Sequence, residues 1–149
     1  MIPPATMKTT HPCHTVTLTS QLAVFVENRP GTLARVCEAL AEADINIHAM
    51  TISDTVDHTV LRMVVSDPRR ALFLFEERNV LVVETEVLMV EADNHPGSVA
   101  QLARLLADGK VNIEYLYCAT NPRTRHGVII LRVSDPHKAL KLLQPPAEA

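Results

Sequence analysis

The chain has 149 residues, of which 47% are hydrophobic and 21% are charged, and its formal net charge is −3 at pH 7. This slightly acidic balance argues against broad binding to nucleic acid or to anionic membranes, because both need a basic surface. Apolar runs are too short for a membrane span or a signal peptide, and the three widely spaced cysteines match neither a disulfide framework nor a zinc motif, so we expect a cytoplasmic protein with reduced thiols.

Residues 1–14 are rich in Pro and Thr and lack apolar periodicity, which predicts a flexible N-terminal arm. The arm includes the sequence His11-Pro12-Cys13-His14, which holds three potential metal ligands. Because no fourth ligand is in view, we expect no metal there. Val16 and Leu18 then alternate with threonines, a β-branched pattern that predicts a strand over 15–19.

The next residues predict the first strand and the first helix of a compact unit. Alternating apolar residues over 22–26 predict a strand, and residues 33–41 have the spacing of an amphipathic helix. The apolar stripe of this helix consists of Leu33, Val36, Cys37, Leu40 and Ala41.

Residues 44–52 and 59–65 predict two further strands joined by a polar hairpin, with Leu61, Met63 and Val65 facing the helices. Asp67 is the expected cap of a second helix that begins at Pro68. The buried side of this helix consists of Ala71, Leu72 and Phe75. A fourth strand over 81–83 completes a unit at residues 15–85, with the element order β-α-β-β-α-β of ferredoxin-like domains.

The turn from Glu27 to Leu33 joins the first strand to the first helix, and its residues are suited to binding a small anion. Pro30 fixes φ where a helix start leaves an amide unpaired, and Gly31 permits close backbone approach. We expect Thr32 to cap the helix, with the amides of Gly31, Thr32 and Leu33 pointing outward. Helix-start amides backed by the positive end of the helix dipole favour a carboxylate.

This turn recurs 66 positions later, which determines the predicted architecture. Asn28, Pro30 and Gly31 correspond to Asn94, Pro96 and Gly97, and the strand and helix patterns around them recur as well. The sequence therefore predicts an α+β fold of two tandem ferredoxin-like βαββαβ units, at residues 15–85 and 86–149, each an antiparallel sheet with helices on one face.

The second unit lacks one expected element. After the helix that ends near Leu143, residues 144–149 contain no fourth strand, and a sheet edge would be left open. We expect the strand over 15–19 to fill this place, either in its own chain or in a partner chain, because open edges promote aggregation.

No catalytic constellation is found. The seven histidines are scattered without metal-site spacing, and no phosphate loop or nucleophile motif is present, so we expect no catalytic residues, no metal and no cofactor. Tyr115 and Tyr117 alternate along a strand, where they either wall a pocket or pack in the core.

The two turns instead have the chemistry to recognise an α-amino acid. Helix-start amides suit its carboxylate, and the side chains of Asn28 and Asn94 suit its ammonium or its carboxylate. The alternative is that each Asn caps the local backbone. Arg29 and His95 differ between the copies, which predicts sites of unequal affinity or one degenerate site.

With the paired Asn-x-Pro-Gly turns and the β-α-β-β-α-β order, residues 20–143 resemble the ACT domain, a small regulatory module of amino-acid metabolism, present here as a stand-alone tandem pair. The resemblance implies that an amino acid binds at the interface between ACT units, held by a strand-to-helix turn of one unit and the second strand of its neighbour. The ligand-binding residues that it implies are Asn28, Arg29, Gly31, Thr32, Leu33, Asn94, His95, Gly97, Ser98 and Val99.

We therefore expect a non-enzymatic amino-acid sensor that forms a homodimer and regulates an unidentified enzyme in trans. A dimerising interaction module with vestigial ligand sites is the second hypothesis. A small enzyme of the ferredoxin-like fold is the third, disfavoured because no acid/base pair converges.

Overall fold

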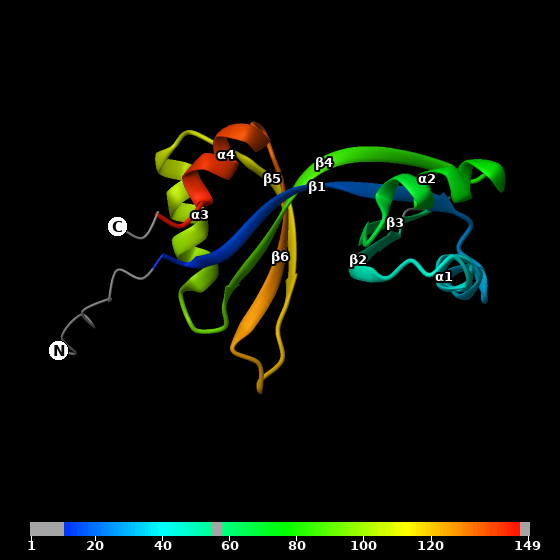
Figure 1. The fold of residues 1–149 in the computed structure, drawn as a ribbon, viewed down its shortest axis with the longest axis horizontal. Coiled ribbons are helices and arrows are strands. Elements are labelled where there is room, and N and C mark those ends of the chain that lie inside the picture. The colour runs from blue at the N-terminus through cyan, green and yellow to red at the C-terminus, as the bar shows by residue number, and fades with distance from the viewer. Residues whose placement is uncertain (1–10, 55–57, 147–149) are drawn as a thin grey trace. The chain divides into compact units, whose positions relative to one another are not determined.

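The computed structural model describes residues 11–54 and 58–146, shown as a ribbon in Figure 1. The predicted order β-α-β-β-α-β is confirmed along the chain. The elements are β1 (Cys13–Val26), α1 (Thr32–Glu42), β2 (Ile47–Asp54), β3 (Thr59–Val65), α2 (Pro68–Glu77), β4 (Leu81–Asp93), α3 (Ser98–Asp108), β5 (Ile113–Ala119), β6 (His126–Val133) and α4 (Pro136–Leu143).

Two of the helices begin at an Asp-Pro pair, as the sequence predicts for α2. The Asp67 side chain accepts a hydrogen bond from the Arg70 amide at 3.1 Å, and Asp135 accepts one from the Lys138 amide at the same distance in α4. Each aspartate thereby pairs one of the amides that a helix start leaves open, and the following proline has no amide to pair.

The chain forms two compact units. The first-repeat unit is Thr19–Val87, and the described part of the second-repeat unit combines residues 11–18 with residues 88–146. The strand order is β2-β3-β1-β4-β6-β5, and the pairs β1·β3, β2·β3, β4·β6 and β5·β6 are antiparallel. Because β1 and β4 each pass from one unit into the other, the two long strands are shared, and each unit has four strands.

The first half of β1 supplies the strand that the second repeat lacks. Cys13, Val16 and Leu18 pack against the core of the second-repeat unit, and the Asp93 amide donates to the Pro12 carbonyl at 3.4 Å. The expectation that this strand fills the open place is thus confirmed, in its own chain. Cys13 and His14, which were expected in the arm, instead begin β1. Their strand conformation comes from pairing with the distant strand β4, which a local sequence pattern does not reveal. Residues 1–10 of the predicted arm lie outside the described residues.

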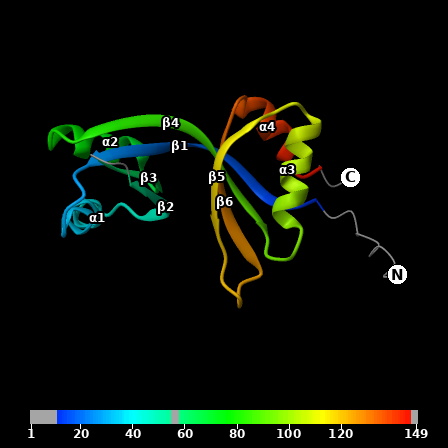
Figure 2. The same cartoon turned by 180° about the vertical axis from the view of Figure 1, so that it is seen from behind.

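Each unit has its own core between its helices and one face of its strands. In the first-repeat unit, Leu61, Met63 and Val65 face the helices as predicted. In the second-repeat unit, Figure 2 shows α3 and α4 together on one side of β5 and β6, and Leu102 and Ala139 from these helices share a core with Leu131. Alternating strand residues thus meet a single helical layer in each unit.

The buried face of α1 differs from the predicted stripe. Val36, Ala39 and Leu40 are buried, whereas Leu33 and Ala41 are exposed. Leu33 lies in the first turn of α1 and Ala41 in its last turn, so the exposed members of the predicted stripe are at the two ends of the helix. Within residues 11–54 and 58–146, no helix has both the length and the apolar character needed to cross a membrane.

Cys13 and Cys118 are expected to differ in reactivity. Burial raises the pKa of the Cys13 thiol to about 11, whereas Cys118 is exposed. Because the thiolate is the reactive form, we expect iodoacetamide at pH 8 to modify Cys118 at least about 10-fold faster than Cys13, measured by peptide mass spectrometry. In guanidinium chloride the rates should converge, and equal rates in the native protein would contradict the placement of β1.

Candidate functional site

The turn after β1 is built on a left-handed glycine. Gly31 has a φ of 86° and occupies the N-cap position of α1. The prediction that Thr32 caps the helix is therefore wrong, because Gly31 takes that position and Thr32 is the first helical residue. The Thr32 amide donates to the Arg29 carbonyl at 3.2 Å, so it is not one of the outward-pointing amides that the sequence predicted.

A cavity of about 500 Å³ lies beside this turn in the first-repeat unit. Its volume falls within the range of about 300–1,000 Å³ that is usual for small-molecule sites. The apolar part of its wall includes Phe25, Val80 and Leu81. A smaller cavity of about 220 Å³ shares Val80 with it and extends to Phe75. The turn therefore borders a space large enough for a small organic ligand.

The polar part of the wall brings opposite charges together. Glu27 and Arg29 form an ion pair at 3.0 Å between Oε2 and Nε, and Arg35 donates to Thr32 Oγ1 at 3.5 Å. A Cβ placed on Gly31 would lie 3.6 Å from Arg35 Nη1, so this guanidinium lies close to the turn. Since a guanidinium has five N–H donors and Arg35 makes one long contact to Thr32, it retains donors for a carboxylate.

The second turn repeats the backbone of the first. Gly97 has a φ of 92° at the N-cap of α3, and the Ser98 amide donates to the His95 carbonyl at 3.2 Å. Ser98 is only 4% exposed, and its Oγ has no hydrogen-bond partner among the described residues. Such a buried, unpaired hydroxyl at a helix start is unusual.

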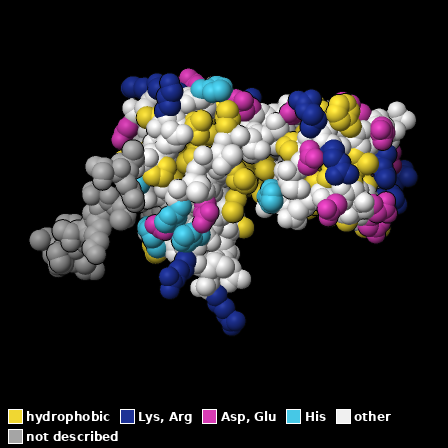
Figure 3. Space-filling view, in the orientation of Figure 1, with side chains coloured by type: hydrophobic (Ala, Val, Ile, Leu, Met, Phe, Trp, Pro, Cys, Tyr) yellow, Lys and Arg dark blue, Asp and Glu magenta, His cyan; other side chains and the backbone are white. Residues whose placement is uncertain are grey.

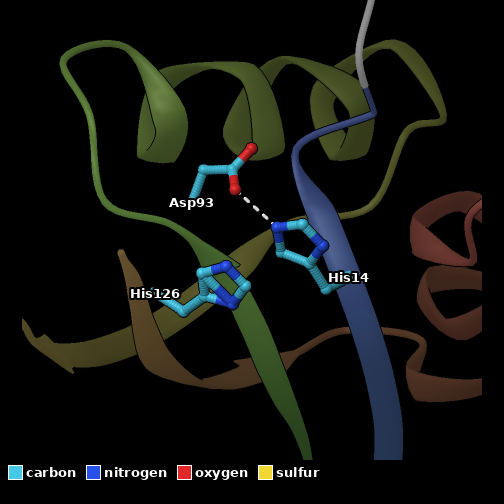
Figure 4. Close-up of side chains that lie close together, drawn as sticks. All are labelled: His14, Asp93 and His126. Carbon is cyan, nitrogen blue, oxygen red and sulfur yellow. Dashed lines mark hydrogen bonds and ion pairs between the residues drawn. The ribbon is translucent and has the colours of Figure 1, made fainter. Parts of the chain in front are cut away.

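A polar cluster of His14, Asp93 and His126 lies where the second turn begins (Figure 4). His14 Nε2 is hydrogen-bonded to Asp93 Oδ1, and the two imidazole rings stack with centroids 4.2 Å apart. In Figure 3 histidine side chains gather beside carboxylates on this face. The prediction that the histidines are scattered is wrong for His14 and His126, because strand pairing brings residues 112 positions apart in the sequence together.

The pKa of the Asp93 carboxyl lies below its usual range, mainly because of the hydrogen bond from His14. Partial burial opposes this shift, and the charges of His14, His95 and His126 add to it. Asp93 is thus ionised at neutral pH. Its contribution to stability is present above the ordinary pKa of aspartate and is lost as the pH falls through the lowered value.

Comparison with known proteins identifies the family to which these two units belong. A family model described as an ACT domain pair matches residues 16–144, nearly the whole described chain. The chain belongs to the ACT domain pair family. A search of curated proteins returns no significant match.

Solved structures similar to this ACT pair cover both repeats. Protein BT0572 from Bacteroides thetaiotaomicron is 32% identical, with a TM-score of 0.79, and the match covers 86% of this chain and 88% of that one. The ligand-free regulatory subunit of aspartate kinase from Thermus thermophilus is 19% identical, with a TM-score of 0.63 and coverage of 89% and 96%. The regulatory subunit of aspartate kinase from Thermus flavus is also 19% identical, with a TM-score of 0.60 and the same coverage. The latter two likenesses show the fold.

The asparagines of the two ACT turns bind neighbouring hairpins. Asn28 Nδ2 donates to Asp54 Oδ1 at 3.3 Å, and Asn94 Nδ2 donates to the carbonyls of Asn121 and Thr124 at 2.9 and 2.8 Å. In Asn94 both amide hydrogens are thereby used, and only Oδ1 remains available. The ligand-binding role of these two residues stays a prediction.

The other predicted residues of the ACT turns fall into two groups. Arg29 and Thr32 line the cavity of the first-repeat unit. Leu33 and Val99 are exposed on α1 and α3, and the His95 Nδ1–H donates to the Pro96 carbonyl at 2.9 Å. The structure therefore brings part of the predicted set together at the first turn.

Glu27, Arg35 and His58 also line this cavity and are not among the predicted site residues. Arg35 lies four residues after Gly31, and that spacing places a helical side chain one turn above the glycine. The signal was therefore present in the sequence. His58 precedes β3, and its place beside the turn depends on the antiparallel pairing of β1 with β3.

Proposed function

We propose that this ACT pair is a non-catalytic regulatory protein that binds a free amino acid at the strand-to-helix turn of its first-repeat unit. The main observation in support is the cavity of about 500 Å³, where charged side chains and an apolar wall lie together. The family assignment and the likeness to regulatory subunits agree with a regulatory role.

The cavity matches the three parts of an α-amino acid. Arg35 binds the carboxylate through its guanidinium donors, and the Glu27 carboxylate accepts from the ammonium once the ligand displaces Arg29 from their ion pair. The apolar wall formed by Phe25 and Leu81 contacts the ligand side chain. A concave site with an apolar lining and a few convergent polar groups is the usual design of small-molecule sites.

The second turn differs at the positions that provide charge. His95 and Gln101 occupy the places of Arg29 and Arg35 in the repeat, so the cationic carboxylate partner is absent from that α3 position. The Ser98 hydroxyl there has no hydrogen-bond partner among the described residues, but its Oγ is buried. We propose that the first turn is the stronger amino-acid site and that the second is weaker or degenerate.

Regulation requires that the ligand bind two states of the protein with different affinities. We propose that the protein forms a homodimer, in which a strand of the neighbouring copy contributes to the site, and that it acts on an enzyme in trans. The alternative of an interaction module with vestigial sites predicts an intact dimer without amino-acid binding.

A thermal-shift screen against the twenty amino acids tests this proposal. A ligand at 100 times its Kd stabilises the native state by about 2.7 kcal/mol, which raises the Tm by about 5–10 °C in a chain of this size. The Arg35→Ala variant should bind the selected amino acid about 10- to 100-fold more weakly, because it loses charge-assisted hydrogen bonds.

The matched control is Arg104→Ala, which removes an exposed arginine that pairs with Asp108 on α3. Its Tm shift should equal that of the wild type. No shift with any amino acid at millimolar concentration would contradict the proposed function, and an equal loss in both variants would contradict the role of Arg35.

A further inference from the structure

The cluster of His14, Asp93 and His126 converges from three separate strands. His14 lies near the start of β1, Asp93 ends β4 and His126 begins β6, all within the second-repeat unit. One donor atom from each residue lies within 4.8 Å of the other two. We propose that this cluster is a binding site for a divalent first-row transition-metal ion such as Zn²⁺.

The donor set matches the chemistry of such an ion. Imidazole nitrogen suits Zn²⁺, Ni²⁺ and Cu²⁺, and a carboxylate oxygen completes a set of two nitrogens and one oxygen, whereas Mg²⁺ and Ca²⁺ prefer all-oxygen sites. In the close-up of Figure 4 the three side chains point toward a common region. The fourth position of a tetrahedral ion is left to water or to another ligand.

Glu91 orients one of the two imidazoles. His126 Nδ1 donates to Glu91 Oε1 at 2.7 Å, and this contact leaves Nε2 as the nitrogen with the lone pair for the ion. A metal-binding histidine commonly donates its other ring N–H to a carboxylate, which fixes its tautomer and its orientation. The cluster therefore includes an outer carboxylate as well as three direct ligands.

The two imidazoles lie next to each other beside the carboxylate. His14 and His126 stack with an angle of 2° between the ring planes and a centroid distance of 4.2 Å, and Asp93 lies within reach of both. The two histidines are exposed and Asp93 is half-buried, so an ion has access to the donors and the side chains have room to close around it.

The first-repeat unit has a different arrangement at the corresponding positions. Glu27 and His58 occupy the positions of Asp93 and His126 in the repeat. Glu27 and His58 line the cavity of the first-repeat unit, together with Leu81 of β4. The two repeats have thus diverged, with a cavity beside one turn and the histidine cluster beside the other. Because Asp93 directly precedes Asn94, a bound ion would hold the start of the second turn and link β1 to β4 and β6.

Titration of the full chain with ZnCl₂ by isothermal calorimetry, after removal of any affinity tag, tests this site. We expect one Zn²⁺ per chain, and at least about 100-fold weaker binding in His126→Ala and in Asp93→Asn, since each loses a direct ligand. Glu91→Gln should weaken binding by about 10- to 100-fold through the orientation of His126. MgCl₂ and CaCl₂ should give no saturable heat.

The control is His48→Ala, which removes an exposed histidine of β2 in the first-repeat unit and should bind Zn²⁺ as the wild type does. A Zn²⁺-dependent rise in Tm that is present in this control and absent in His126→Ala would give a second readout. No saturable Zn²⁺ binding by the wild type, or equal affinity in His126→Ala and His48→Ala, would overturn the proposal. These titrations contain no amino acid, so their outcome is independent of the proposed sensor function.

Discussion

A chain carrying both Val16→Asp and Leu18→Asp is expected to lose about 3–5 kcal/mol of its unfolding free energy, since two charges would enter the core of the second-repeat unit. Both side chains pack against that core from the first half of β1. Urea denaturation followed by circular dichroism measures the loss. The second-repeat unit should unfold at a lower urea concentration than the first-repeat unit.

The matched control is Thr15→Asp with Thr17→Asp, which adds the same charges to the exposed side of the same strand. Its unfolding free energy should stay within about 1 kcal/mol of the wild type. If the two double variants unfold at the same urea concentration, β1 does not close the second-repeat unit, and the strand must have another role.

Replacing Phe75 with alanine is expected to destabilise the first-repeat unit by about 3–5 kcal/mol, because the side chain is only 1% exposed and its removal leaves a cavity among packed neighbours. Phe73, two residues earlier on α2, is 54% exposed and provides the control. Phe73→Ala should change the unfolding free energy by less than about 0.5 kcal/mol. Equal effects of the two substitutions would contradict the orientation of α2.

Phe75 also borders the smaller cavity beside Arg35. For this reason, the Phe75→Ala variant is suited to stability measurements and not to ligand-binding measurements. A change in the ligand site and a loss of stability of the unit would have the same effect on the thermal shift.

The repeat made most of the fold predictable from the sequence. Local patterns determine the strand faces and helix starts, and for this reason Met63 faces the helices and Asp67 caps α2 as expected. Two copies of the same turn then indicated the pair of units. Such features depend on residues that are close in sequence, which periodicity and capping rules describe well.

The division of β1 between the units was harder to predict. A strand that begins at Cys13 and ends at Val26 contributes to both units, and its pairing with β4 joins residues that are far apart in sequence. The missing strand after Leu143 indicated a gap, but the sequence left open whether this chain or a partner fills it. Only the three-dimensional arrangement distinguishes these alternatives.

The candidate sites were predictable only in part. The turns were found because Gly31 and Gly97 repeat with their neighbours, and both glycines have a positive φ that favours glycine. The histidine cluster gave no local signal, since His14 and His126 meet through strand pairing. Arg35 lies outside the repeated turn, and its place at the cavity depends on the helix that carries its side chain back over Gly31.

The proposed amino-acid site is tested by calorimetric titration of the wild type and two variants with the amino acid that gives the largest thermal shift. Arg35→Ala and Gln101→Ala truncate the same helical position in the two repeats. We expect saturable binding by the wild type, retention of this binding in Gln101→Ala, and a loss of about 10- to 100-fold in affinity in Arg35→Ala. Equal affinity in all three proteins, or no saturable heat in the wild type, would contradict an amino-acid site at the first turn.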